Sequence, residues 1–103
     1  MPEMTFTVRW PDGRVVDHYS PSLVMHDHLA EDTAYPIAEF RSRSATALGI
    51  ASDRVRAKFG FACTSAAASL ADIDELASSY PQDAAVTVLR LHPPLPSSHL
   101  QES

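Results

Sequence analysis

The sequence predicts an α+β fold in which a β-hairpin, two helices and a closing strand follow one another (ββααβ). Apolar residues alternate near the N-terminus, recur every three or four residues in the middle of the chain, and gather in a β-branched run near its end. With 103 residues, 45% of them hydrophobic, the chain can bury one core without disulfides. We therefore expect a single domain over residues 1–91, with helices on one face of a small sheet, and a disordered, proline-rich tail over 92–103.

The first expected element is the hairpin. Residues 5–10, TFTVRW, alternate apolar and polar side chains, which predicts a strand that buries Phe6, Val8 and Trp10. Pro-Asp-Gly at 11–13 is typical of a turn, because proline presets the first position and glycine can take a positive φ. The second strand, VVDHY at 15–19, begins with two adjacent valines, which leaves its inner face open.

A long helix is expected over residues 37–59. One apolar stripe with steps of three or four residues runs through Ile37, Phe40, Ser44, Leu48, Ala51, Val55 and Phe59. Gly60 then stands at the position of a helix-ending glycine. Gly49 weakens this helix by about 1 kcal/mol relative to alanine, and Ser52 can cap a separate helix if the first ends there. We favour one continuous helix.

A second helix and a strand complete the expected fold. Thr64 or Ser65 can cap the helix, and Pro81 ends it. Its inner stripe consists of Ala66, Leu70, Ile73, Ala77 and Tyr80. AVTVLRL at 85–91 predicts a strand, which we pair with the first. Such a sheet leaves edges and one face uncovered, so we expect a homo-oligomer, most simply a homodimer.

Charge and cysteine content restrict the classes of partner. A net charge of −5 argues against nucleic acid and membrane surfaces, although residues 36–60 carry five basic and two acidic side chains. The single Cys63 excludes an internal disulfide and fits a reducing compartment. Neither a basic N-terminal region followed by an apolar stretch nor a run of about 18 apolar residues occurs. We expect a cytoplasmic protein.

His26-Asp27-His28 poses the question of a metal site. On a strand, the two imidazoles would share a face and could bind one metal ion, whereas on a helix they point about 200° apart. Ser20 as the cap and Pro21 as the first residue are typical of a helix start, so we favour separated surface histidines. For a metal site, the remaining ligands would come from Asp27, His18, His92 or Cys63.

Cys63 is a candidate for a nucleophile. It precedes a predicted helix start, where backbone N–H groups can lower the pKa of a thiol. The alternative is a small residue packed at a tight junction between helices, which the neighbouring alanines favour.

Basic residues on the long helix form the main candidate binding surface. Arg43 and Arg54 are eleven residues apart and share nearly one azimuth, with Lys58 a further turn along. This basic edge can pair with acids such as Glu39, or bind an anion or partner. Arg41 lies near the apolar stripe and should snorkel or meet a buried carboxylate. Nearby, the hydroxyls of Ser20 and Ser22 can hold a small anion, or simply cap a helix.

Several stretches together resemble one small bacterial family. They are VRWPDG at 8–13, YSPS at 19–22, YPIAEF at 35–40, ASDRVRAKFGFACTSA at 51–66 and the closing VTVLRL. Over residues 1–91 the chain resembles the small nitrogen-starvation-response proteins encoded beside a nitrilase, in gene clusters linked to nitrile and cyanide assimilation. The resemblance implies this cellular context and supplies no reaction, cofactor or active site.

Two functional hypotheses follow. The first is a non-enzymatic accessory or regulatory protein of nitrogen assimilation or the nitrogen-starvation response, which binds a protein partner from the same gene cluster or a small anionic metabolite. Its candidate surface is the basic edge together with the Ser-Pro-Ser turn. The second is a small enzyme or metal-binding protein of the nitrilase pathway that uses Cys63, or His26 and His28.

Overall fold

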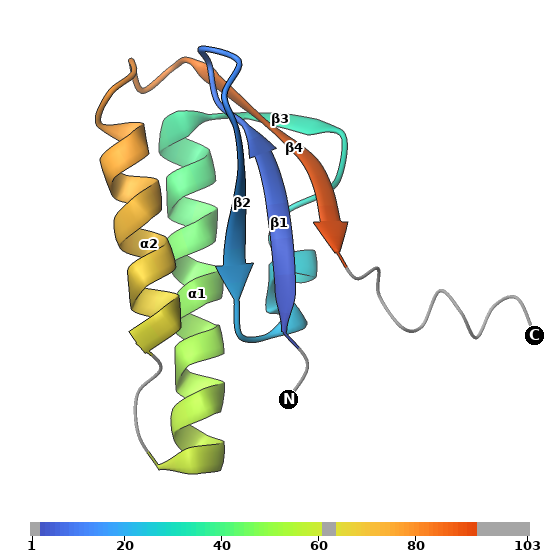
Figure 1. Cartoon of the computed structure of the whole chain (residues 1–103), viewed down its shortest axis with the longest axis vertical. Coiled ribbons are helices and arrows are strands. Elements are labelled where there is room, and N and C mark those ends of the chain that lie inside the picture. Colours follow the sequence, from blue (N-terminus) through green and yellow to red (C-terminus); the bar gives the residue numbers. More distant parts are fainter. Residues whose placement is uncertain (1–2, 61–63, 93–103) are drawn as a thin grey trace, which may run out of the picture.

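The computed structural model describes residues 3–60 and 64–92 and confirms the α+β class. Four strands form one antiparallel sheet in the order β2-β1-β4-β3. They are β1 (Met4–Arg9), β2 (Val15–Ser20), β3 (Thr33–Pro36) and β4 (Ala85–His92). Two helices, α1 (Ile37–Phe59) and α2 (Thr64–Ala77), lie on the same side of this sheet (Figure 1). The short 3-10 helix η1 (Leu23–Asp27) joins β2 to β3.

The predicted hairpin is present, and its register resolves which face of β2 lies inside. Phe6 is opposite His18 and Val8 is opposite Val16, so these four side chains share the helix-facing side. At the turn, Gly13 has a φ of 92°, and its N–H donates to the Trp10 carbonyl at 2.8 Å. Glycine takes this backbone conformation without the strain that a side chain would add.

The closing strand β4 pairs with β1, as expected, but its other neighbour β3 was not predicted. β3 is only four residues long and ends at Pro36, which is tolerated because β3 is an edge strand. Tyr35 of β3 pairs with Val86 of β4. The stretch TAYP shows no alternation of apolar and polar residues that would predict a strand. Its strand conformation comes from pairing with β4, about fifty residues away in the sequence.

Helix α1 is a single helix of 23 residues, as predicted, and Gly49 does not interrupt it. Gly60 ends it in the left-handed conformation, with a φ of 84° and its N–H donating to the Arg56 carbonyl at 2.8 Å. The expected burial of Phe59 was wrong, because this side chain is 54% exposed. The C-terminal turns of α1 extend past the end of the four-stranded sheet (Figure 1).

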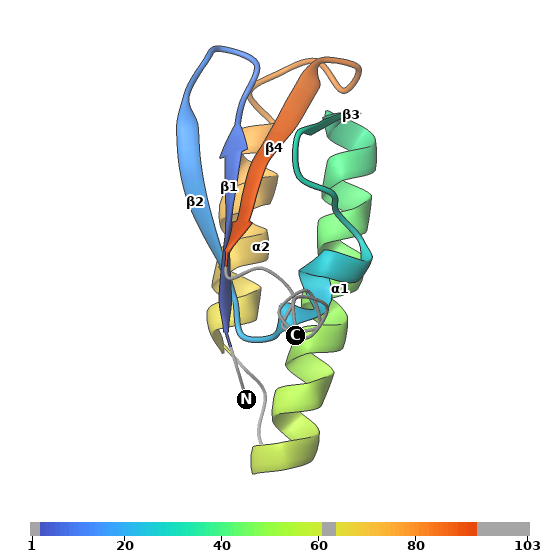
Figure 2. The ribbon, with the colours of Figure 1, turned by 90° about the vertical axis from the view of Figure 1, so that its right-hand side faces the viewer.

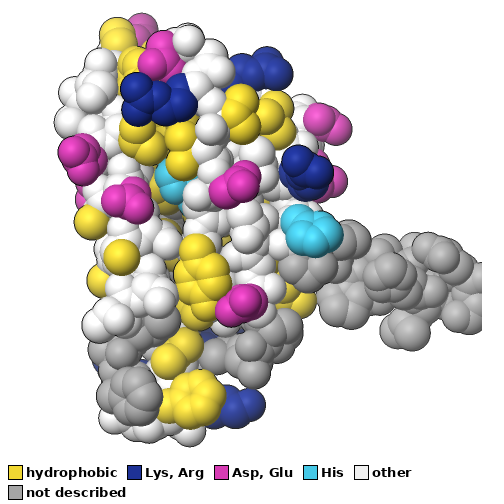
Figure 3. All heavy atoms as spheres, in the orientation of Figure 1, with side chains coloured by type: hydrophobic (Ala, Val, Ile, Leu, Met, Phe, Trp, Pro, Cys, Tyr) yellow, Lys and Arg dark blue, Asp and Glu magenta, His cyan; other side chains and the backbone are white. Residues whose placement is uncertain are grey.

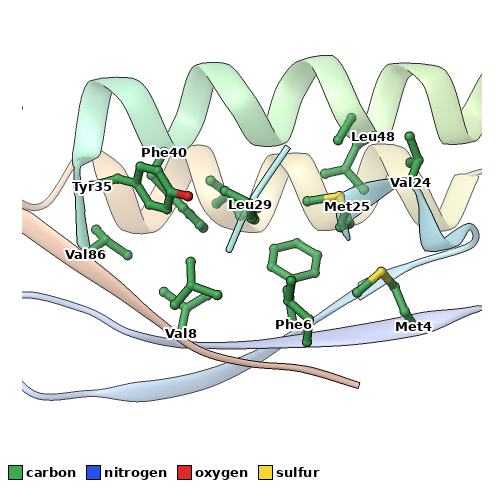
Figure 4. Close-up of a cluster of buried hydrophobic side chains, with 14 of the residues drawn as sticks. Met4, Phe6, Val8, Val24, Met25, Leu29, Tyr35, Phe40, Leu48 and Val86 are labelled. Atoms are coloured by element: carbon green, nitrogen blue, oxygen red, sulfur yellow. The ribbon is translucent and has the colours of Figure 1, made fainter. Parts of the chain in front are cut away.

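The core lies between the sheet and α1, and η1 fills part of it. Phe6 and Val8 of β1 point toward Phe40 and Leu48 of α1, with Met25 and Leu29 from the η1 segment between them (Figure 4). Phe6, Met25 and Phe40 are fully buried. Trp10, just after β1, is also buried and packs edge-on against Phe40 at a centroid distance of 5.6 Å.

The other face of the sheet is covered by no element of residues 3–60 and 64–92, and we call it the open face. Figure 2 looks onto it, with the strands in front of α2. In the described part of the chain, no helix combines the length and apolar character needed to cross a membrane. The expected homodimer and cytoplasmic location remain predictions, and the expected tail lies outside the described residues apart from His92, which ends β4.

Candidate functional site

The Ser-Pro-Ser turn is occupied by its own hydrogen bonds. Ser22, and not Ser20 as predicted, is the N-cap of η1, and its hydroxyl accepts from the Val24 N–H at 3.3 Å. Ser20 still belongs to β2, opposite Met4, and its hydroxyl donates to the Ser22 carbonyl at 2.7 Å. Both serines are buried, at 0% and 2% exposure. In this structure neither hydroxyl is open to a ligand from solvent.

Arg43 and Arg54 do share one face of α1, and that face lies against η1. Arg54 Nη1 donates to the Ser22 hydroxyl at 3.0 Å, at the start of η1. Arg43 Nη1 donates to the His28 carbonyl at 3.0 Å, at the end of η1. Arg43 also pairs with Glu39 at 2.7 Å, as the sequence spacing predicted, and its guanidinium lies 5.0 Å from the Tyr35 ring centroid. The two arginines thus hold both ends of η1.

The other basic candidates lie apart from this contact. Arg41 Nε meets Asp74 Oδ1 at 2.6 Å and joins α1 to α2, but the expected buried carboxylate is a partly exposed one, at 44%. This hydrogen bond lowers the pKa of Asp74. Lys58, near the C-terminal end of α1, lies 5.9 Å from the Phe59 ring centroid.

The structure separates the candidate metal ligands that it describes. His26 lies within η1 and His28 is its C-cap, and residues two apart in a 3-10 helix differ by about 240°. His18 points into the helix-facing side of the sheet, whereas His92, opposite Thr5, lies on the open face. Within residues 3–60 and 64–92, no three His, Cys, Asp or Glu side chains gather in a way that could hold a metal ion. Cys63 lies outside the described residues.

His18 is a buried histidine with an unusual environment. Its ring lies 5.3 Å from Phe6 and 6.1 Å from Trp10, measured between centroids. Nε2 has no hydrogen-bond partner among the described residues. Burial lowers the pKa of His18 to about 4, against the opposing charges of Asp72 and Asp17. The imidazole is therefore neutral near pH 7, and this environment was not foreseen from the sequence.

The open face carries a shallow polar hollow that sequence reasoning did not find. It has a volume of ≈ 280 Å³ and is lined by Thr5, Thr7, Asp17, Arg90 and His92. The strand register arranges these side chains in two rows across β2, β1 and β4. One row is Asp17, Thr7 and Arg90, and the other is Tyr19, Thr5 and His92. Basic, acidic and histidine side chains are visible on the strand side of the molecule in Figure 3.

A β-bulge decides which side chains of β4 reach the hollow. Val8 pairs with Val88, but Thr7 pairs with Arg90, so Leu89 is an extra residue in the ladder. Strict alternation from Val86 and Val88 would have turned Arg90 toward the helices. The bulge places Leu91 inside, where it is 3% exposed, and Arg90 on the open face. The adjacent apolar residues Val88 and Leu89 in the run VTVLRL permit such a shift but do not locate the extra residue.

Hydrogen bonds fix the strands and side chains of the hollow, while its charged residues Arg90 and Asp17 are outside the ion pairs of the described chain. Glu31 Oε2 accepts from the Leu91 N–H at 2.7 Å, which holds β4 beyond the end of β3. Thr7 Oγ1 donates to Asp17 Oδ1 at 2.7 Å. Within the described residues, neither Arg90 nor Asp17 makes an ion pair within 4.0 Å. A guanidinium without a carboxylate partner, next to hydroxyls and an imidazole, can bind an anion from solution.

A second hollow lies between β2 and α2, with a volume of ≈ 390 Å³. Its lining is Arg14, Val16, Asp72, Glu75, Leu76 and Ser79. Two carboxylates surround one arginine there, so the local charge repels anions. The hollow of the open face is the better candidate for an anionic ligand.

Comparison with known proteins gives a family. No curated protein and no solved structure matches the chain. The model of the family described as nitrogen starvation-induced protein NitG matches residues 5–91, which include all the described strands and helices except Met4 and His92. A match over that much of the chain means that it belongs to the NitG family of nitrogen starvation-induced proteins.

Proposed function

We propose that this protein is a non-enzymatic accessory or regulatory protein of the nitrogen-starvation response, and that it binds a small anionic metabolite on the open face of its sheet. The family match supports the starvation context. The sequence resemblance supports a setting among nitrilase genes of nitrile or cyanide assimilation. The unpaired Arg90 in the hollow of the open face is the observation that carries the binding role.

The chemistry of the hollow favours a ligand with a carboxylate or phosphate group over one without an anionic group. Arg90 offers a planar set of N–H donors that matches carboxylate or phosphate oxygens. His92, two residues after Arg90 and on the same face, adds a ring N–H that can donate a hydrogen bond to the ligand. Thr5 supplies a hydroxyl that donates or accepts. A volume of ≈ 280 Å³ is close to the lower end of the range for small-molecule sites, about 300 Å³, so the ligand is small.

The preferred candidate surface is therefore the open face, and not the α1 arginines that the sequence indicated. Arg43 and Arg54 each donate a hydrogen bond to the η1 segment, and Ser20 and Ser22 beside them are buried. Arg90 has its charge available, on a strand that pairs with β1 and is held by Glu31 beyond the end of β3. Regulation would then follow if the occupied open face is recognised by a partner encoded in the same gene cluster.

An NMR titration of the full chain with glutarate tests the binding role. We expect saturable amide shifts in β1, β2 and β4, and a Kd that rises about tenfold in Arg90→Gln, because one charge-assisted hydrogen-bonded pair is lost. Arg56→Gln is the matched control, since it removes the same charge from an exposed site on α1. Equal effects of the two variants, or no shifts at all, would contradict the proposal.

A test in cells follows from the same pair of variants. Under nitrogen starvation, Arg90→Gln should reproduce the phenotype of deleting the gene, while Arg56→Gln should behave as wild type. Normal growth of the Arg90→Gln strain at normal protein levels would show that the open-face arginine has no part in the function.

A further inference from the structure

We infer that the hollow of the open face selects small zwitterions that carry both a carboxylate and an ammonium group, of which α-amino acids are the most common class. This inference rests on the proposed anion-binding function and adds the opposite charge. It is carried by the pairing of Asp17 and Arg90 on either side of Thr7.

The two charges stand at opposite sides of the hollow. Asp17 is on β2 and Arg90 on β4, with β1 between them, so their Cα atoms are about two strand spacings, roughly 10 Å, apart. Across this distance they form no ion pair with each other. A ligand that bonds to both must place a positive group toward Asp17 and a negative group toward Arg90. In an α-amino acid these two groups are only a few ångströms apart, so with a hydrogen bond of about 3 Å to each residue such a ligand can bridge the two side chains.

Asp17 still has an oxygen with which to accept such a bond. Thr7 Oγ1 donates to Oδ1 at 2.7 Å, and this bond fixes the orientation of the carboxylate above the floor of the hollow. The second oxygen, Oδ2, is then turned away from that bond, and an ammonium donor can reach it from solvent. Thr7 itself is 7% exposed, so it orients Asp17 more than it contacts the ligand.

The same arrangement disfavours ligands that carry only one charge. An anion bound to Arg90 and His92 lies between the two sides of the hollow, within about one Debye length (about 8 Å at physiological salt) of Asp17, which repels it. An ammonium group on the ligand turns that repulsion into attraction. A simple amine is disfavoured in the same way by Arg90. The site therefore gains selectivity from both charges and not from Arg90 alone.

Matched ligand pairs test this selectivity in the full chain. NMR titrations with L-alanine against propionate, and with L-glutamate against glutarate, compare acids that differ only in the ammonium group. We expect each amino acid to bind about tenfold more tightly than its deaminated partner. In Asp17→Asn, which keeps an acceptor for Thr7, this preference should fall to about one. Asp83→Asn, the same charge change at an exposed turn, should keep the wild-type preference.

The outcomes separate the two proposals. Amino acids and deaminated acids that bind equally well, both weakened by Arg90→Gln, would overturn the zwitterion selectivity and leave the anion site standing. Failure of all four ligands to shift the amides of β1, β2 and β4 would overturn both. A preference for amino acids that survives in Asp17→Asn would show that Asp17 is not its source.

Discussion

The two faces of the sheet are made by the same strands, and they differ in what their side chains have as partners. On the helix-facing side, Phe6 and Val8 are fully buried among side chains of α1 and η1. On the open face, Thr5 and Thr7 of the same strand lie among charges that have no partner of opposite sign within 4.0 Å in the described part of the chain. One side of β1 thus stabilises the fold, while the other remains available for binding. Substitutions on the two faces should therefore have separable effects.

The largest expected effect comes from a core substitution. Phe6→Ala should lower the free energy of unfolding by about 3–5 kcal/mol, because it leaves a cavity beneath α1. Urea unfolding measures this loss. Thr5→Ala, one residue away on the open face, should stay within about 0.5 kcal/mol. Similar losses for both variants would mean that the two faces of β1 contribute alike to stability.

The next effect is a pH dependence on the helix-facing side. Because burial lowers the pKa of His18 to about 4, below its unfolded value of about 6.5, the unfolded chain takes up the proton first as the pH falls. The stability present at pH 7 should therefore decrease below pH 6.5, by about 2–3 kcal/mol at pH 4.5. His18→Gln should remove this part of the pH dependence. His92→Gln, on the open face, should retain this pH dependence. Loss of the dependence in His92→Gln would mean that it does not come from His18.

A smaller effect is expected where α1 holds η1. Arg54→Met keeps most of the side-chain stem but removes the donor to Ser22, and should reduce stability by about 1 kcal/mol. Hydrogen exchange of the η1 amides should become faster at the same time. Arg56→Met is the control, because the Arg56 side chain lies on an exposed surface, 3.6 Å from Asp53. A double-mutant cycle with Ser22→Ala that shows no coupling between the two residues would argue against this role.

The smallest effect is expected at the pair between the helices. Arg41 and Asp74 are 46% and 44% exposed, so solvent screens their attraction despite the short distance of 2.6 Å. Arg41→Gln should change stability by less than about 1 kcal/mol, and the change should shrink further in high salt. A large loss that is independent of salt would reveal a packing role for the Arg41 stem.

The sequence predicted elements whose signals are local and missed those that depend on distant partners. Helix α1 was predictable because its inner stripe, apolar except for Ser44, keeps steps of three or four residues from Ile37 to Val55, and a glycine stands directly after its last residue. Strand β3 was not, because four residues without a period become a strand only when β4 lies beside them. The common face of Arg43 and Arg54 followed from helix geometry, but their contact with η1 is a tertiary feature.

In the candidate site, too, local sequence signals place some residues and miss the one that depends on a tertiary feature. Thr5 and Thr7 alternate with apolar residues, and Asp17 lies opposite Thr7, so their place on one face could be foreseen once β2 was in register. Arg90 could not be placed, because one extra residue at Leu89 exchanges the faces of the strand beyond it. Bulges have no reliable sequence signal, and here the bulge brings the one arginine of β4 to the hollow.

A map of amide shifts across the whole chain at saturating L-glutamate tests most directly whether the open face is the binding face. We expect shifts that centre on Thr7, Asp17 and Arg90 and are absent from α1. Shifts that instead follow η1 and the α1 residues around Arg43 and Arg54 would contradict it, and would return the binding role to the basic edge of that helix.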